Sequence, residues 1–205
     1  MKKAVRVMLL PALAALAAAT AGAGESAAVD SQAPAFTLRD ASGVSHSLAD
    51  YRGKYVILEW VNFTCPFVGK HYGSGSMQDL QKTMTARGVI WLSICSSAPG
   101  REGYYEGDAL NAKIREEHAS PTAYLVDADG KVGRAYGAKT TPDMYIIDPG
   151  GTLIYAGGID NIPSTDREDI AKARNYVKEV MQAVWDGKPA PVKSTRSYGC
   201  SVKYN

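Results

Sequence analysis

Two runs of mostly apolar residues, 55–61 and 89–95, predict buried strands in this chain. The second has too many apolar positions to expose one face to water, which is typical of an interior strand in a parallel sheet. Between them, Met77, Leu80 and Met84 recur at helical spacing after Ser76, and Gly88 ends that segment. The pattern therefore predicts a strand, a helix and a parallel strand in succession.

The remaining pattern extends this alternation along the chain. Three extended segments are predicted at 35–38, 45–48 and 122–126, and a hairpin is predicted for 144–147 and 152–155 around Asp148-Pro149-Gly150-Gly151. Two helices are predicted from Cys65 to Tyr72 and from a capping Asp108 to His118. A last helix is predicted from Ser164 or Thr165 to Gly187, with a Thr165–Glu168 capping box. This order predicts an α/β fold with a central mixed β-sheet flanked by helices on both faces.

Residues 1–23 have the composition of a cleavable signal peptide. The segment starts with the basic residues Lys2, Lys3 and Arg6 and continues with an apolar run at 7–19. It ends with the small residues Ala21-Gly22-Ala23, which suit a cleavage site. The apolar run is too short for a typical membrane span. We therefore expect an exported protein, periplasmic or secreted, with no membrane attachment after cleavage. Residues 24–205 then form a single domain that ends in a tail, 187–205.

Charge excludes some classes of partner. The whole chain has a formal net charge of +2, which becomes −1 once the three basic residues of segment 1–23 are removed. A nearly neutral chain has no electrostatic basis for binding nucleic acid or a membrane surface.

Three cysteines carry the candidate chemistry: Cys65, Cys95 and Cys200. Cys65 directly precedes Pro66, which suits the first position of a helix, so its sulfur would lie where the helix dipole stabilises a thiolate. The alternative is a buried cysteine that packs as a small hydrophobic residue. The apolar surroundings of Cys95 favour an inert thiol. Because the number is odd, at least one thiol stays free or pairs with another molecule.

The order of elements, with Cys65-Pro66 after a core strand and Thr141-Pro142 before the hairpin, resembles the thioredoxin-like superfamily. More narrowly, four segments resemble its exported redoxin or peroxiredoxin-like (AhpC/TSA-type) branch: Phe36–Asp40, Asn62–Val68, Tyr136–Ala138 and Tyr198–Lys203. The resemblance implies a thioredoxin-like fold in which Cys65 is the redox-active residue and faces a cis-proline loop at Thr141 and Pro142.

Val68 departs from both relatives. A thioredoxin has its second cysteine at this position, and a peroxiredoxin has its peroxide-attacking cysteine there, with Thr or Ser three residues earlier, where this chain has Cys65. Exchange within a local dithiol is therefore excluded, and a dedicated peroxidase site does not transfer. A second sulfur must come from elsewhere. We predict a reversible disulfide between Cys65 and Cys200, the latter on a mobile tail; the alternative is that Cys200 only fixes the tail or stays free.

These observations predict an exported thiol-dependent oxidoreductase with Cys65, Cys200, Thr141 and Pro142 as site residues. Its partners would be protein thiols and disulfides or small peroxides, together with an unidentified electron donor. No cofactor or metal is expected. Lys70 and His71 are interpreted as residues on a solvated helix face, and a copper site needs a second nearby cysteine. The alternative function is a non-catalytic redoxin-fold module that binds a protein partner or metal and has structural cysteines.

Overall fold

The computed structural model describes residues 26–205, so the predicted signal peptide lies outside the described residues. Its main feature is a seven-stranded sheet with the order β2-β1-β5-β4-β3-β7-β8. The strands are β1 (Thr37–Asp40), β2 (Ser45–Ser47), β3 (Val56–Trp60), β4 (Ile90–Cys95), β5 (Ala123–Val126), β7 (Asp143–Ile147) and β8 (Leu153–Gly157). Strands β3, β4 and β5 are parallel, and the other neighbours are antiparallel. The mixed sheet is thus confirmed.

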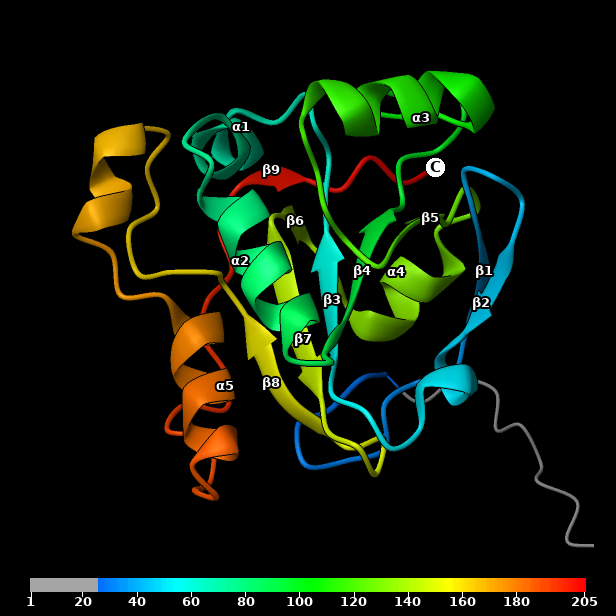
Figure 1. Ribbon diagram of the computed structural model, residues 1–205. Coiled ribbons are helices and arrows are strands. Elements are labelled where there is room, and N and C mark those ends of the chain that lie inside the picture. Colours follow the sequence, from blue (N-terminus) through cyan, green and yellow to red (C-terminus); the bar gives the residue numbers. More distant parts are fainter. Residues whose placement is uncertain (1–25) are drawn as a thin grey trace, which may run out of the picture.

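Helices cover both faces of this sheet (Figure 1). They are α1 (Pro66–Gly73), α2 (Ser76–Ala86), α3 (Gly107–Glu116), α4 (Lys131–Tyr136) and α5 (Tyr176–Trp185), with short 3₁₀ helices η1 (Leu48–Tyr51) and η2 (Arg167–Ala171). Buried residues of α1, α2 and α5 belong to one hydrophobic cluster, and Tyr136 of α4 belongs to a second cluster on the opposite face. The two clusters confirm the predicted layered α/β architecture.

Successive side chains of β3 point to opposite faces of the sheet, so this one strand contributes to both hydrophobic clusters. Val56, Leu58 and Trp60 belong to the cluster with α4, and Ile57 belongs to the other. Glu59 is fully buried. Its carboxylate accepts hydrogen bonds from four side chains: Tyr72, Gln81, Trp91 and Ser93. Burial raises the pKa of Glu59, and this network satisfies a carboxyl group that would otherwise be costly in the core.

The prediction of one continuous last helix from Ser164 or Thr165 is wrong. The segment forms η2, which is capped by Asp166, and then α5, which is capped by Asn175 through the Lys178 amide. An antiparallel bridge between Asp160 and Asn175 ties the start of α5 to the chain that leaves β8. Because this bridge fixes an extended backbone at Asn175, the helix cannot run through it.

Two smaller predictions also need correction. No helix was predicted at α4, which is only six residues long, and α3 begins after Glu106 rather than after a capping Asp108. Helix α2 begins at Ser76 as expected, but its N-cap is Gly75 in a left-handed conformation (φ 78°), without a side-chain cap. A glycine at this position allows the sharp turn between α1 and α2.

The tail forms a second, two-stranded sheet. Strand β9 (Cys200–Ser201) pairs antiparallel with β6 (Thr140–Thr141), the short strand that precedes β7. In Figure 1 β9, in red, passes beside β6 below α1. Along the described chain, we find no helix with the length and apolarity needed to cross a membrane.

Candidate active site around Cys65

Cys65 is the N-cap of α1 in an extended conformation, and Pro66 opens the helix. The loop between β3 and α1 is held by Asn62, whose side-chain oxygen accepts hydrogen bonds from the amide (2.9 Å) and the hydroxyl (2.7 Å) of Thr64. The Cys65 sulfur is therefore fixed at the start of a helix, where unpaired amides and the helix dipole favour negative charge.

The loop at Thr141 and Pro142 lies against this sulfur. The Thr141–Pro142 peptide bond is cis, as the resemblance implies. The Cys65 thiol donates a hydrogen bond to the Thr141 carbonyl oxygen at 3.2 Å. The Thr141 hydroxyl is buried and has no hydrogen-bond partner in the described part of the chain. Three of the four predicted site residues therefore meet at one point.

Cys200, the fourth, joins them through the β6–β9 pairing. Its Cα is in register with that of Thr141, and Ser201 is in register with Thr140. All three cysteines are free thiols, and Cys65 and Cys200 lie close enough to perturb each other's ionisation. Segment 187–205 is therefore not the mobile tail that the sequence suggested, because its end is docked on the site.

The two thiols ionise differently. Burial raises the pKa of the Cys65 thiol, but hydrogen bonds from the Cys200 thiol and from the Val68 amide outweigh burial, so its pKa is lowered. Burial and the neighbouring Cys65 raise the pKa of Cys200 to about 11. Because the pKa of Cys65 is lowered and that of Cys200 is raised, Cys65 is the thiol of the pair that ionises first. A thiolate is the reactive form of cysteine.

Lys70 and His71 are buried, so their interpretation as solvated helix-face residues is wrong. The Lys70 ammonium donates to the Ile162 carbonyl oxygen at 2.8 Å and lies 3.4 Å from a carboxylate oxygen of Asp160. Asp160 also accepts a 2.6 Å hydrogen bond from the Tyr198 hydroxyl. The buried charges therefore anchor the tail two residues before Cys200.

His71 completes this anchor, which consists of Lys70, His71, Asp160 and Tyr198. Its Nε2 lies 3.3 Å from the Tyr198 hydroxyl oxygen and 3.8 Å from a carboxylate oxygen of Asp160. Burial lowers the pKa of His71 to about 4, although the Asp160 charge acts in the opposite direction. His71 is therefore neutral at physiological pH. Sequence spacing gave no signal for this cluster, since Asp160 and Tyr198 are distant in the chain from α1.

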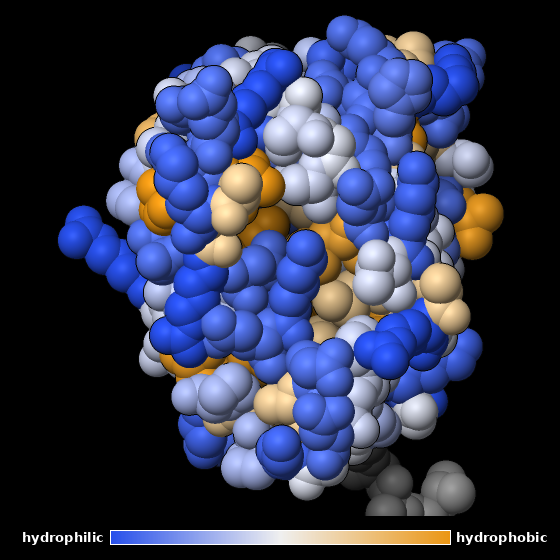
Figure 2. Space-filling view, turned by 60° about the vertical axis from the view of Figure 1, so that its left-hand side comes forward, coloured by the Kyte–Doolittle hydropathy of each residue, from blue (hydrophilic) through white to orange (hydrophobic). Residues whose placement is uncertain are grey.

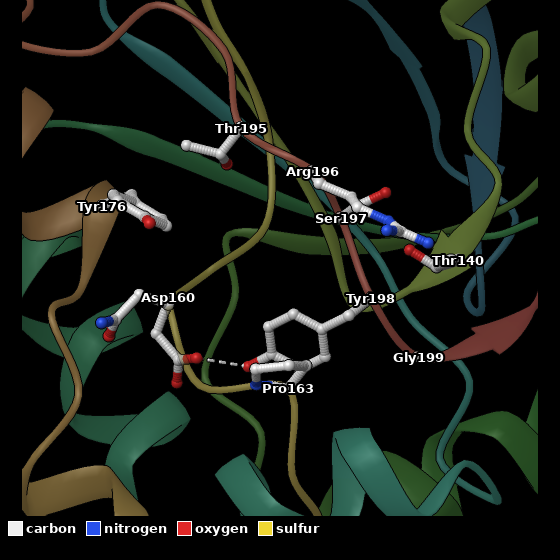
Figure 3. A pocket seen from close by; sticks show the side chains of 10 residues that line it. Thr140, Asp160, Pro163, Tyr176, Thr195, Arg196, Ser197, Tyr198 and Gly199 are labelled. Carbon is white, nitrogen blue, oxygen red and sulfur yellow. Dashed lines mark hydrogen bonds between the residues drawn. The ribbon is translucent and has the colours of Figure 1, made fainter.

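A cavity of about 620 Å³ lies beside the tail. Figure 3 shows its lining, which includes Thr140, Asp160, Tyr176 and tail residues 195–199, with the Tyr198 hydroxyl pointing to Asp160. The molecular face formed by the left-hand side of Figure 1 is largely hydrophilic, and apolar side chains show mainly in its hollows (Figure 2). Gly199, the residue before Cys200, is one of the residues that line the cavity.

Cys95 lies apart from this arrangement. It is 2 % exposed, and its thiol donates to the Gly103 carbonyl oxygen at 3.4 Å. Burial raises the pKa of its thiol, which fits the predicted inert cysteine. Within residues 26–205, no three His, Cys, Asp or Glu side chains are grouped so that they could hold a metal ion.

Comparisons with known proteins identify the family of the chain. Residues 29–156 match the model of the AhpC/TSA family. The chain is 30 % identical over 127 residues to the thiol-disulfide oxidoreductase ResA of Geobacillus thermodenitrificans, covering 62 % of this chain and 67 % of the relative.

Solved structures show the same fold. A hypothetical protein of Sinorhizobium meliloti superposes with a TM-score of 0.73 at 23 % identity, covering 88 % of this chain and 97 % of the other. An uncharacterized conserved protein of Geobacillus kaustophilus has a TM-score of 0.73 at 26 % identity, covering 87 % and 93 %. With its thioredoxin-like fold and the family match over most of its length, the chain belongs to the AhpC/TSA family of the thioredoxin-like superfamily.

Proposed function

We propose that this protein is a thiol-disulfide oxidoreductase that works through a reversible disulfide between Cys65 and Cys200. The observation that carries the proposal is the register of β9 on β6. It sets Cys200 opposite Thr141, the residue whose carbonyl accepts the Cys65 thiol. The relatives named as thiol-disulfide oxidoreductases support a general oxidoreductase role.

In this proposal the Cys65 thiolate is the nucleophile that closes the disulfide, and Cys200 is the thiol with which it pairs. Oxidation of the pair removes two electrons and two protons and forms one sulfur–sulfur bond, and a partner disulfide that accepts them becomes two thiols. Thr141 and Pro142 frame the Cys65 sulfur, and the Thr141 hydroxyl is a free donor for the thiolate. Val68 supplies no sulfur, so the second thiol comes from the C-terminal tail.

Peptide mapping of the oxidised protein under non-reducing conditions tests this. We expect a cross-linked peptide that joins Cys65 to Cys200 and is absent from a Cys200→Ser variant. A Cys95→Ser variant is the matched control, because Cys95 is buried elsewhere and its loss should leave the cross-link intact. If oxidation yields no such peptide, or joins Cys95 instead, the proposed disulfide is wrong.

Peroxide reduction is a second activity compatible with a lowered Cys65 pKa. The Cys65 thiolate would attack one peroxide oxygen, forming a sulfenic acid and releasing water or an alcohol. The Cys200 thiol would then condense with the sulfenic acid, releasing water and forming the disulfide. Hydroperoxide consumption by wild type and by Cys65→Ser decides this, and equal rates would eliminate it.

Titration of the thiols separates an enzyme from a non-catalytic binding module. Alkylation of Cys65 measured across pH should give a pKa below the free-thiol value of about 8.5. A pH profile that places the Cys65 pKa at or above the free-thiol value would favour a module with structural cysteines.

We propose export to the periplasm or outside the cell, on the basis of the composition of residues 1–23. An oxidising compartment suits a Cys65–Cys200 disulfide. N-terminal sequencing of the protein purified from its source should begin close after Ala23, and an intact Met1 would contradict cleavage.

A further inference from the structure

We propose that a partner forms its mixed disulfide with Cys200 of this protein. Cys65 is the buried sulfur that leaves as a thiolate when this bond forms, and it attacks Cys200 again when the reaction runs in reverse. This inference rests on the proposed function. It concerns which of the two sulfurs a partner bonds to, and it assigns the entry point to the tail rather than to the start of the helix.

Burial is the first argument. Cys65 is 2 % exposed, whereas Cys200 is partly exposed. The backbone of the tail lies directly over the loop that contacts Cys65, because a Cβ at Gly199 would overlap the Thr141 carbonyl. A thiol that approaches from solvent therefore meets Cys200 before it can reach Cys65.

The tail is also fastened on both sides of Cys200, so it does not uncover Cys65 easily. Before it, Tyr198 donates to Asp160 at 2.6 Å. After it, the Val202 amide donates to the Lys139 carbonyl oxygen at 3.0 Å, and the Lys203 carbonyl oxygen accepts from the Ala98 amide at 2.9 Å. The Tyr204 hydroxyl donates to the Ala138 carbonyl oxygen at 2.8 Å. Exposing Cys65 would break these hydrogen bonds together.

A polypeptide partner has room to approach Cys200. Strand β9 pairs only with β6 among the strands of residues 26–205 and its Ser201 is exposed, so an extended segment could add along its other edge. The cavity of about 620 Å³ beside residues 195–199 extends to the position just before Cys200 (Figure 3). A protein thiol on an extended segment fits this approach, with its chain along β9 and its flanking side chains in the cavity.

The step balances as a thiol-disulfide exchange. A partner thiolate attacks the Cys200 sulfur of the Cys65–Cys200 disulfide, a partner–Cys200 bond forms, and the electron pair of the broken bond leaves on Cys65 as a thiolate. A second thiolate of the same partner then attacks the partner sulfur of this mixed disulfide and releases Cys200, which takes up a proton. The partner is oxidised by two electrons and the protein is reduced.

The ionisation of the pair agrees with this direction. The thiol with the lower pKa is the better leaving group. The pKa of Cys65 is lowered and that of Cys200 is raised. Attack on the Cys200 sulfur, with Cys65 as the leaving group, therefore gives the more stable thiolate. In reverse, the Cys65 thiolate attacks the mixed disulfide on Cys200 and frees the partner.

The test uses the full wild-type chain, oxidised and first mapped to show the Cys65–Cys200 cross-link. The oxidised protein is mixed with glutathione, quenched within seconds by N-ethylmaleimide, and its peptides are analysed by mass spectrometry. We expect glutathione on the Cys200 peptide and maleimide on the Cys65 peptide, in at least about tenfold excess over the opposite pattern, given the leaving-group preference.

Two other results are distinguishable. Glutathione on Cys65 with maleimide on Cys200, or an equal mixture, would overturn the assignment of Cys200 as the entry point while leaving the disulfide intact. Absence of the cross-link before glutathione is added would refute the proposed function itself, and with it this inference.

Discussion

Replacing Gly199 with alanine tests whether the tail shields Cys65. Gly199 has φ +133°, a conformation that residues with a side chain rarely adopt. An added Cβ would lie 2.7 Å from the Thr141 carbonyl carbon and nearer still to its oxygen, where real Cβ atoms essentially never come within 3.0 Å. The overlap is with backbone, so no flexible side chain can move aside. Alanine therefore forces β9 away from β6.

The size of the effect follows from the conformation that is lost. Holding a residue other than glycine in a sparsely populated backbone region costs about 1–3 kcal/mol. Because this free energy destabilises only the state in which the tail is docked, it raises the population of the open tail by about 5- to 150-fold. Since Cys65 is 2 % exposed when the tail is docked, its reaction with a bulky alkylating reagent should accelerate by a similar factor.

The assay follows Cys65 alkylation by peptide mass spectrometry in reduced protein, with far-UV circular dichroism to show that each variant is folded. Gly43→Ala is the matched control. Gly43 also has positive φ, +83°, but a Cβ there meets nothing within 4 Å, in a turn between β1 and β2. It should lose some stability and leave Cys65 protected. A folded Gly199→Ala protein with unchanged Cys65 alkylation would refute the view that the docked tail shields this sulfur.

Three further predictions concern buried charges. The pKa of His71 is lowered from 6.5 to about 4, so the unfolded state takes up the proton first and the free energy of unfolding falls by about 3 kcal/mol as the pH drops through this range. His71→Gln should lessen that fall in urea titrations. A pH profile identical to that of the wild type would contradict this prediction. Lys70→Met leaves Asp160 without its buried cation and should cost about 3–5 kcal/mol in urea unfolding; a loss below about 1 kcal/mol, typical of exposed pairs, would contradict this. Trp91→Phe removes a donor that lies 2.8 Å from the Glu59 carboxylate and should lower the free energy of unfolding by about 1–3 kcal/mol, more at pH values where this carboxyl is ionised. A loss of stability that does not depend on pH would show that the missing hydrogen bond does not stabilise the charged form.

Much of the sheet was predictable because its signals are local. Segment 89–95 is apolar throughout apart from Ser93, and the structure makes it the buried strand β4 between β3 and β5. The hairpin of β7 and β8 follows from a Pro-Gly-Gly turn between two apolar runs. In contrast, the split of the last helix depends on the bridge between Asp160 and Asn175, a pairing that no local window contains.

The site was predictable in its parts and not in its assembly. The position of Cys65 before Pro66 predicted a sulfur at the start of a helix, where the structure has it, and the resemblance implied the cis bond at Pro142. The burial of Lys70 and His71 was missed, because their partner Asp160 lies on a distant loop. On a helix surface Lys is usually solvated, whereas here Lys70 and His71 are covered by the loop of Asp160 and Ile162 and by Tyr198 of the tail.

The docking of β9 has a practical consequence for handling this protein. The last residue, Asn205, accepts a hydrogen bond from Arg134 through its carbonyl oxygen at 3.1 Å, and the Tyr204 ring packs on the same guanidinium group. A tag fused after Asn205 would begin beside these contacts of Arg134, a few residues from Cys200. Redox measurements on a protein with a tag fused after Asn205 would therefore report on a disturbed thiol pair unless the tag is removed first.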